Sequence, residues 1–348
     1  MNYLEFLHKE LTLPEPQKEA PLVLDLFAGC GGLALGFEAV GFRTIGFEIL
    51  EDACATYNKN LNGNCFRKFL KPGQDLVGEE KVDVVIGGPP CQPFSVGGYQ
   101  NGPDDSRDGF PAFLWTVERY KPRIFIFENV RGMQYRNKIY LSKIISKLAA
   151  YGYIVEPPMI LNALHYGVPQ KRERLFVVGH HGGWQPPNRV SLRSPYTVGD
   201  ALGNFALCAP TQSKFLTPSM DKYIAKYEKK SNCIRPRDLR LDEPSRTVTC
   251  RNLYGATGDM LRIRLPDGRR RMLTIQEGAR LQSFPDWFIF IGSEGSQFKQ
   301  IGNAVPPLMA KAVARSALAY LNDTDRKRSE KIEQGKFLGQ MSFEFIGQ

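Results

Sequence analysis

The strongest indication of the fold is the stretch Val82-Asp-Val-Val-Ile-Gly-Gly-Pro-Pro-Cys-Gln-Pro-Phe-Ser95. Its apolar residues 82–86 predict a buried strand, and the Gly-Gly-Pro-Pro run predicts a stiff turn directly after it. The turn places Cys91 on a loop beyond the carboxyl end of that strand, where open α/β sheets bind ligands. We interpret Cys91 as a reactive thiol, because loops carry function and a core cysteine rarely needs such a turn. The alternative is a small apolar core residue, as most cysteines are.

The bulk composition describes a basic, soluble globular protein of one large or two modest domains. The chain has 348 residues, a formal net charge of +10, 42% hydrophobic and 24% charged residues. The positive charge favours a polyanion as partner, because neutralising phosphates releases counterions. Seven cysteines without a Cys-x-x-Cys pair, and only four histidines, predict no structural metal site and a reducing compartment, which we expect to be the cytoplasm. No signal peptide and no apolar run long enough to span a membrane is found.

A second motif near the start of the chain predicts a cofactor pocket. Residues 21–27 read as a strand, 28–32 as a glycine turn, 33–40 as a helix and 44–47 as a second strand. The spacing Gly29-x-Gly31-x-x-Ala34, with Glu48 about 20 residues on, fits the relaxed dinucleotide fingerprint. These residues predict a nucleoside-bearing cofactor and leave both NAD and S-adenosylmethionine open. A glycine turn that only packs a helix on a strand is the plain alternative.

Taken together, the motifs resemble those of the cytosine-5 DNA methyltransferases. The resemblance runs from about Leu22 to Leu321 in the order of the family, through the segments 25–32, 89–95, 128–130, 166–179, 271–286 and 300–307. It implies a Rossmann-like α/β sheet with helices on both faces and a small, mostly β and loop target recognition domain across a cleft. We expect a catalytic domain in two parts, 1–179 and 271–322, a recognition domain at 180–270 and a solvated tail at 323–348.

The resemblance also implies that the cofactor is S-adenosylmethionine. Phe27 would stack on the adenine, Glu48 would take the ribose, Ile49 would cover the other adenine face, and Asp75 would accept from the adenine amine. Phe110 is expected to contact the cofactor. The alignment of this segment with the family motif is open, because we expect Pro111 to interrupt the helix that follows the motif in the family. The remaining cofactor residues would be Ala28, Gly29, Gly31, Leu76, Pro90, Asn303 and Ala304.

The family chemistry starts with a thiolate adding to C6 of a cytosine, which makes C5 electron-rich. Cys91 would supply the thiolate, Glu128 would protonate N3, and Arg174 would hold O2, with the base flipped out of the duplex. Arg172 is grouped with them as catalytic, because two arginines two apart on a strand project from one face. The alternatives are a strand-end glutamate facing water and a solvated basic pair.

The recognition segment is strongly basic, and we expect its arginines as a set to contact DNA. Any one of them is as easily a solvated surface residue. Either Thr247 or Thr249 would touch the DNA backbone, and the loop 95–110 would close over the DNA. The set comprises Arg235, Arg237, Arg240, Arg246, Arg251, Arg262, Arg264 and residues 269–271; the DNA-binding residues singled out are Gln92, Ser95, Arg107, Asn129, Arg246, Thr249 and Arg251.

Two helices are predicted in the returning segment. Thr274 and Glu277 form a capping box for a helix over 275–283. Pro306 and Pro307 suit the start of another helix, in which Met309, Val313, Ala317 and Leu321 form a packing stripe.

We therefore expect a bacterial modification enzyme, paired with a restriction endonuclease and acting as a monomer on duplex DNA. One rival is a tRNA methyltransferase of the same fold, disfavoured because that branch carries a Cys-Phe-Thr signature that is absent here. A nicotinamide oxidoreductase would leave the Pro-Pro-Cys loop unexplained. A non-catalytic DNA-binding module would not need the residues that match every catalytic position of the family.

Overall fold

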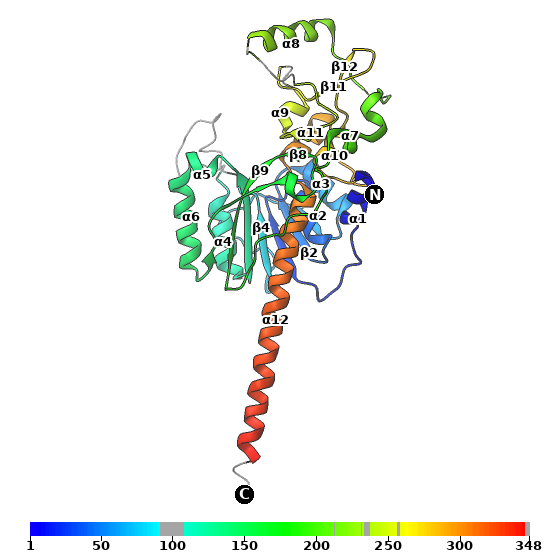
Figure 1. Cartoon of the computed structure of the whole chain (residues 1–348). Coiled ribbons are helices and arrows are strands. Elements are labelled where there is room, and N and C mark those ends of the chain that lie inside the picture. The colour runs from blue at the N-terminus through cyan, green and yellow to red at the C-terminus, as the bar shows by residue number, and fades with distance from the viewer. Residues whose placement is uncertain (91–107, 212, 231, 233–236, 256–257, 345–348) are drawn as a thin grey trace.

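A mixed eight-stranded sheet forms the centre of the computed structural model (Figure 1). The structure describes residues 1–90, 108–211, 213–230, 232, 237–255 and 258–344, with side chains up to residue 327. The strand order is β3-β2-β1-β4-β5-β9-β6, and β7 also pairs with β9. The first five of these are parallel, and β9 runs antiparallel to β5, β6 and β7. The strands are β1 (Leu22–Leu26), β2 (Arg43–Glu48), β3 (Asn64–Arg67), β4 (Val84–Gly87), β5 (Ile124–Val130), β6 (Ile154–Val155), β7 (Met159–Asn162) and β9 (Glu173–His180).

The central strands form where the sequence has short, continuous apolar runs. Every residue of β1 and β4 is buried, as expected of parallel strands covered on both faces. The strands predicted from residues 21–27, 44–47 and 82–86 are thereby confirmed, each shifted by only a few residues.

Helices cover both faces of the sheet. On one face lie α4 (Phe110–Tyr120) and α6 (Lys138–Ala150), whose buried side chains pack against Phe125 and Phe127. On the other face lie α1 (Tyr3–Leu11), α2 (Gly32–Glu38), α3 (Glu51–Asn60) and α12 (Pro307–Glu344). The expectation that Pro111 interrupts the helix is wrong, because Pro111 occupies the first turn of α4, where its missing N–H costs no hydrogen bond.

The returning segment packs in one core cluster with the first helices of the chain. The stripe Met309, Val313, Ala317 and Leu321 is buried, and α12 packs along α2. A Cβ on Gly36 would lie 2.4 Å from the backbone nitrogen of Lys311, so only glycine allows this approach. The capping box at Thr274 is confirmed on α10 (Ile275–Leu281), which α11 (Glu294–Asn303) follows.

The tail expected at 323–348 is helical as far as the structure describes it. Helix α12 continues without a break from the packed stripe to Glu344 (Figure 1). Its first turns beyond the stripe are anchored by Arg123, which donates to the Leu321 carbonyl at 2.9 Å and pairs with Asp325 at 2.9 Å. No helix in the described part of the chain has the length and apolarity needed to cross a membrane.

The region 180–270 contains more helix than expected. Its small apolar cluster joins Leu216, Ile224 and Met260, and Ile224 comes from a thirteen-residue helix, α8. Strand β12 crosses the expected boundary at residue 270. The elements here are α7 (Val198–Leu202), η3 (Gly203–Leu207), α8 (Pro218–Lys230), β10 (Ser245–Arg246), α9 (Cys250–Leu253), β11 (Arg262–Arg264) and β12 (Arg270–Met272). Short elements elsewhere are α5 (Met133–Arg136), η2 (Ala163–Tyr166) and β8 (Gln170–Lys171), which pairs with β10.

Candidate active site

The turn after β1 is shaped by three residues with positive φ. Gly29 and Gly31 have φ of +56° and +87°, which glycine adopts at little cost. Phe27 has φ of +59°, which is rare for a side chain with a Cβ, and such strain gathers at ligand sites. The turn therefore presents Phe27 and the backbone of the first α2 turn at the carboxyl edge of the sheet.

Glu48 ties this turn to the end of β2. Its carboxylate accepts from the Gly29 N–H at 2.9 Å and from the N–H groups of Ile49 and Leu50 at 2.8 Å each. The side chain of Ile49 is 50% exposed beside it, so its apolar surface is accessible. Asp25 lies below, fully buried, and burial followed by the charge of Glu48 raises its pKa well above the usual range. One of its oxygens, Oδ2, has no partner among the described residues.

Two further segments close around Phe27. A Cβ on Gly109 would lie 2.5 Å from Pro90 Cδ and 2.8 Å from the Phe27 ring. The Gly109 N–H donates to the Pro90 carbonyl at 3.0 Å, which joins the turn after β4 to the start of α4. Phe110 is fully buried, with its ring edge-on to Phe127 at 5.2 Å. Its side chain is thus a core residue, and only its backbone is left to face a cofactor.

Asp75 and Leu76 lie on the loop between β3 and β4. The Asp75 carboxylate accepts from Tyr120, from Arg119 at 3.2 Å and from the Gly78 N–H at 3.2 Å. The Tyr120 hydroxyl, followed by Arg119, lowers the pKa of Asp75. The Leu76 N–H donates to the same tyrosine hydroxyl at 2.6 Å. The adenine contact expected of Asp75 stays a prediction, and its carboxylate already has three donors.

Glu128 and Arg174 meet at the edge of the sheet where β4 and β5 end. Arg174 Nε lies 2.9 Å from Glu128 Oε1, and both side chains are mostly buried. A Cβ on Gly88 would lie 3.4 Å from Glu128 Oε2, so the glutamate stands over the turn that leads to residue 91. Burial raises the pKa of Glu128, and the charges of Arg174 and Arg172 oppose that rise. A buried carboxyl whose pKa is raised is a candidate general acid.

Asn129 fixes the turn after β4. Its Nδ2 donates to the Pro89 carbonyl at 3.0 Å, and its Oδ1 accepts from the Val130 N–H at 2.8 Å. The residue expected here as a DNA contact thus clamps the backbone just before Cys91. Five predicted residues lie outside the described part of the chain: Cys91, Gln92, Ser95, Arg107 and Arg235.

Arg172 points into a buried hydrogen-bonded cluster of its own. Its guanidinium donates to the carbonyls of Val248 at 2.6 Å, Gly302 at 3.1 Å and Ala304 at 2.9 Å. These acceptors come from the recognition segment and from the last motif. Burial followed by the charge of Arg174 lowers the pKa of Arg172.

Two glutamines complete this cluster, and we call Gln170, Arg172 and Gln282 the polar joint. Gln170 donates to Gln282 Oε1 at 2.6 Å and accepts from the Val248 N–H at 2.7 Å. Gln282 donates to the Ile301 and Ala304 carbonyls at 2.8 and 2.9 Å. All three side chains are fully buried. The sequence analysis missed both glutamines, although Gln170 lies in the same segment, 166–179, as the two arginines.

Residues 302–305 lie directly against the glycine turn, residues 28–32. A Cβ on Gly32 would lie 2.6 Å from the Val305 carbonyl and 3.1 Å from the Ala304 Cβ. Asn303 is exposed beside it. The predicted cofactor residues of the last motif are therefore brought to the glycine turn, as the sequence implied.

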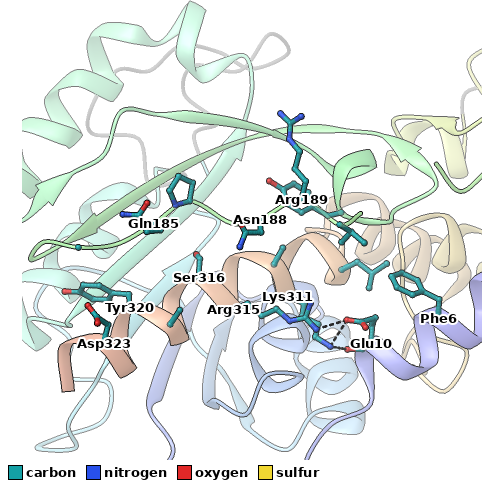
Figure 2. Close-up of a pocket in the computed structure, with 17 residues that line it drawn as sticks. Phe6, Glu10, Gln185, Asn188, Arg189, Lys311, Arg315, Ser316, Tyr320 and Asp323 are labelled. Atoms are coloured by element: carbon teal, nitrogen blue, oxygen red, sulfur yellow. Dashed lines mark hydrogen bonds and ion pairs between the residues drawn. The ribbon is translucent and has the colours of Figure 1, made fainter. Parts of the chain in front are cut away.

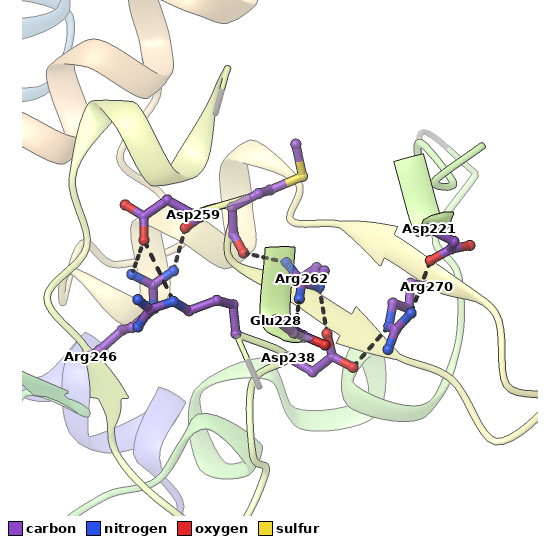
Figure 3. A network of polar contacts seen from close by, with 9 residues as sticks. Asp221, Glu228, Asp238, Arg246, Asp259, Arg262 and Arg270 are labelled. Carbon is purple, nitrogen blue, oxygen red and sulfur yellow. Dashed lines mark hydrogen bonds and ion pairs between the residues drawn. The ribbon is translucent and has the colours of Figure 1, made fainter. Parts of the chain in front are cut away.

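The arginines of the recognition region are mostly engaged inside the protein (Figure 3). Arg262 and Arg271 are fully buried, so the expectation that they contact DNA is wrong. Arg262 pairs with Asp238 and with Glu228 at 2.8 Å, and Arg271 pairs with Glu277 at 2.7 Å. The other acid pairs here are Arg270 with Asp238 and Asp221, Arg246 and Arg237 with Asp259, Arg240 with Asp242 and Glu243, and Arg269 with Asp267.

Arg251 and Arg264 differ from that set. Both are exposed, and neither has an acid partner within the ranges that the structure describes. Thr247 donates to the Lys171 carbonyl at 2.8 Å, whereas Thr249 caps α9 by accepting from the Asn252 N–H. Each threonine therefore has a local bond, and the choice between them stays open.

A separate cavity of about 680 Å³ lies between α1, α12 and residues 183–190 (Figure 2). Glu10 pairs there with Lys311 at 3.0 Å and with Arg315 at 2.9 Å. Its lining includes no residue of the glycine turn, of the Glu128–Arg174 pair or of the polar joint. It is therefore not the site described above.

Comparison with known proteins agrees with this geometry. The family model of C-5 cytosine-specific DNA methylases matches residues 22–319. The "Type II methyltransferase M.AplI" of Arthrospira platensis is 60% identical over 93% of each chain, and "Type II methyltransferase M1.HphI" of Haemophilus parahaemolyticus is 34% identical over 85% of this chain and 86% of its own. The crystal structure of a mutant Spodoptera frugiperda DNMT2 shares the fold, with a TM-score of 0.66, 17% identity and coverage of 86% of this chain and 100% of that one. This chain belongs to the C-5 cytosine-specific DNA methylase family and is a DNA (cytosine-5-)-methyltransferase.

Proposed function

We propose that this enzyme methylates C5 of a cytosine flipped out of duplex DNA, through a covalent bond between Cys91 Sγ and C6 of the base. The observation that carries the proposal is the buried Glu128–Arg174 pair, 2.9 Å apart, above the turn that leads to Cys91. A planar base needs both a proton donor for N3 and a cation for O2 on one edge. This pair offers the two groups side by side.

The residues divide the chemistry between them. The Cys91 thiolate forms a bond to C6, and the electron pair that this releases is taken up as N3 receives the proton of Glu128. Arg174 holds O2 and limits the charge that develops there. C5, now electron-rich, would form a bond to the methyl group as the bond between that methyl and the donor sulfur breaks, with the electron pair going to the sulfur. Loss of the C5 proton to a base then expels Cys91 as the thiolate, and N3 returns its proton to Glu128, which restores the ring.

S-adenosylmethionine is the proposed cofactor, and it supplies a methyl group on a positively charged sulfur. The described residues fit such a molecule. Phe27 and Ile49 offer apolar faces to an adenine, and Glu48 stands at the end of β2, where a ribose would lie. The glycine turn between them leaves its backbone open, because a Cβ on Gly29 would meet nothing within 4 Å.

Arg172 is proposed to position the site and not to touch the base. Its two Nη atoms are already bonded to three backbone carbonyls. Those carbonyls belong to the recognition segment and to the motif that lies on the cofactor turn. Arg172 would thus set the distance between DNA recognition and the methyl donor.

We also propose that the protein is the modification enzyme of a type II restriction-modification system and acts as a monomer. The 60% identity to a protein named as a type II methyltransferase supports the first point. The second rests on one chain supplying every described site residue. The recognised bases depend on the few side chains that reach the major groove. Bisulfite sequencing of plasmid from an expressing host would identify them.

A duplex containing 5-fluorocytosine tests the covalent step. The methylated intermediate should be trapped on the enzyme, because fluorine does not leave as a proton, and a denaturing gel should show a slower band. Cys91→Ser should abolish both the band and methyl transfer while duplex binding persists. Cys208→Ser, at an exposed cysteine away from the site, is the matched control and should behave as wild type. Turnover by the Cys91→Ser enzyme would remove Cys91 from its role.

The tRNA-directed alternative makes a different prediction for the acceptor. Tritiated methyl groups should enter duplex plasmid DNA and not bulk tRNA under the same conditions. Transfer to tRNA at the higher rate would replace DNA as the proposed substrate.

A further inference from the structure

Helices α5 and α6 follow directly from the strand that carries Glu128. Strand β5 ends at Val130, α5 begins at Met133 and α6 begins at Lys138. The start of α6 therefore lies at the same edge of the sheet as the Glu128–Arg174 pair (Figure 1). Any duplex that delivers a base to Glu128 must pass close to this surface.

This segment has an unusual charge pattern. Residues 129–155 contain Arg131, Arg136, Lys138, Lys143 and Lys147 and no aspartate or glutamate. A surface held together by ion pairs would carry both signs. A run of a single sign attracts a polyanion, because each phosphate it neutralises releases counterions.

Four of these cations are exposed and have no acid partner in the part of the chain that the structure describes; the fourth is Lys147, near the end of α6, and the three closest to its start are Arg136, Lys138 and Lys143. We call these three the basic face. Arg131 differs, because it pairs with Glu173 at 2.6 Å. The contrast with the recognition region is sharp, since there most arginines are held by acids.

The same surface exposes side chains that a solvated charged helix would not need. Tyr135 is 62% exposed and Ile139 is 77% exposed, and they lie between the cations in the sequence. The Arg131 guanidinium stacks over the Tyr135 ring at 5.4 Å and holds it at the surface. Tyrosine hydroxyls donate to phosphates, and apolar side chains can lie against the sugars between them.

The opposite side of α6 is anchored in the core. Leu141, Ile144 and Leu148 are buried against the sheet, so the helix presents Lys138 and Lys143 on a fixed support. The backbone that carries these cations is therefore already ordered and loses little conformational freedom on binding.

We propose that the basic face binds backbone phosphates of the duplex on the side of the reacting base away from the recognition region. This inference rests on the proposed function, because it names a surface for the same DNA. An acidic surface of a protein partner would satisfy the charge alone. Duplex DNA is favoured because the face adjoins the edge where the base reacts.

The test compares the full-length enzyme with the triple variant Arg136→Gln/Lys138→Gln/Lys143→Gln. Kd for a 30-base-pair duplex is measured between 50 and 200 mM NaCl. Loss of three phosphate contacts should raise Kd by about tenfold or more at 100 mM and flatten the slope of log K against log salt by about 2.7. Binding of S-adenosylmethionine should stay as in wild type.

Two controls make the result specific. Lys9→Gln/Lys18→Gln/Lys59→Gln removes the same charge from exposed lysines on or beside α1 and α3, and should leave the slope within about 0.5 of wild type. Arg136→Lys/Lys138→Arg/Lys143→Arg keeps the charge and should keep the affinity, which separates lost contacts from misfolding.

The two proposals can fail separately. If the triple variant and the lysine control give the same Kd and slope while wild type methylates DNA, the basic face is wrong and the proposed function stands. If wild type neither binds nor methylates duplex DNA, the proposed function itself fails.

Discussion

The polar joint and the arginine cluster of the recognition region both bury guanidinium groups, but they neutralise them differently. Arg172 in the joint is held by backbone carbonyls, and no carboxylate among the described residues pairs with it. Arg262 and Arg270 in the recognition region share one carboxylate, Asp238, and each has a second acid (Figure 3).

The difference teaches which part of the molecule each set controls. The carbonyls around Arg172 belong to distant segments, so its bonds form only when those segments are placed correctly. Backbone acceptors also cannot be exchanged by mutation. The acids around Arg262 are side chains of the recognition region itself. The conformation of that region therefore depends on its own residues, and substitutions within it can change the ion pairs.

We expect the largest effect, a loss of activity, at Glu128, which pairs with Arg174 next to the polar joint. Glu128→Gln should lower kcat by about 10²–10⁴-fold, because it removes the proposed general acid. In wild type, burial raises the pKa of Glu128, so the acid is protonated below that pKa and kcat should fall as pH rises through it. Steady-state rates from pH 5 to 9 would check this. A falling limb that persists in Glu128→Gln would assign it to another group.

Arg172→Met should give the next largest effect, on stability. Three buried carbonyls lose their donors, and we expect the free energy of unfolding to drop by about 3–5 kcal/mol. Urea unfolding of the full chain would measure it. The control Arg269→Met removes an exposed arginine paired with Asp267 and should cost under about 1 kcal/mol. Equal midpoints for the two variants would show that carbonyl-held arginines contribute no more than surface ones.

Asp238→Asn should give a smaller and more local effect. Arg262 keeps Glu228 and Arg270 keeps Asp221, so we expect a loss of about 1–3 kcal/mol, confined to the recognition region. Hydrogen exchange should speed up in α8 and β11, DNA affinity should fall, and affinity for S-adenosylmethionine should hold. A parallel loss of cofactor affinity would mean that the cluster supports the catalytic domain as well.

The sequence predicted those features that depend on local signals. Apolar runs placed the central strands, a Thr-x-x-Glu pattern placed α10, and spacing of four placed the α12 stripe. The glycine turn and Glu48 were brought together as expected, because the carboxyl ends of parallel strands share one edge.

The burial and the ion-pair partners of the arginines could not be predicted in the same way. Arg262 and Arg271 read as surface cations because their acids, Asp238, Glu228 and Glu277, meet them only in the folded chain. Gln170 and Gln282 carry no local pattern, since they bond to each other and to the backbone of remote segments. Helix α8 was missed because its exposed charges outnumber its one buried residue, Ile224.

The closure of the glycine turn by the returning segment has a consequence for biosynthesis. Cys30 in that turn meets the Gln300 carbonyl from a position 270 residues later in the chain. A ribosome must therefore release almost the whole polypeptide before the donor cradle is complete. Products that end before residue 300 would contain Cys91 but lack the segment that closes the turn, so we expect methylation only from chains that include this segment.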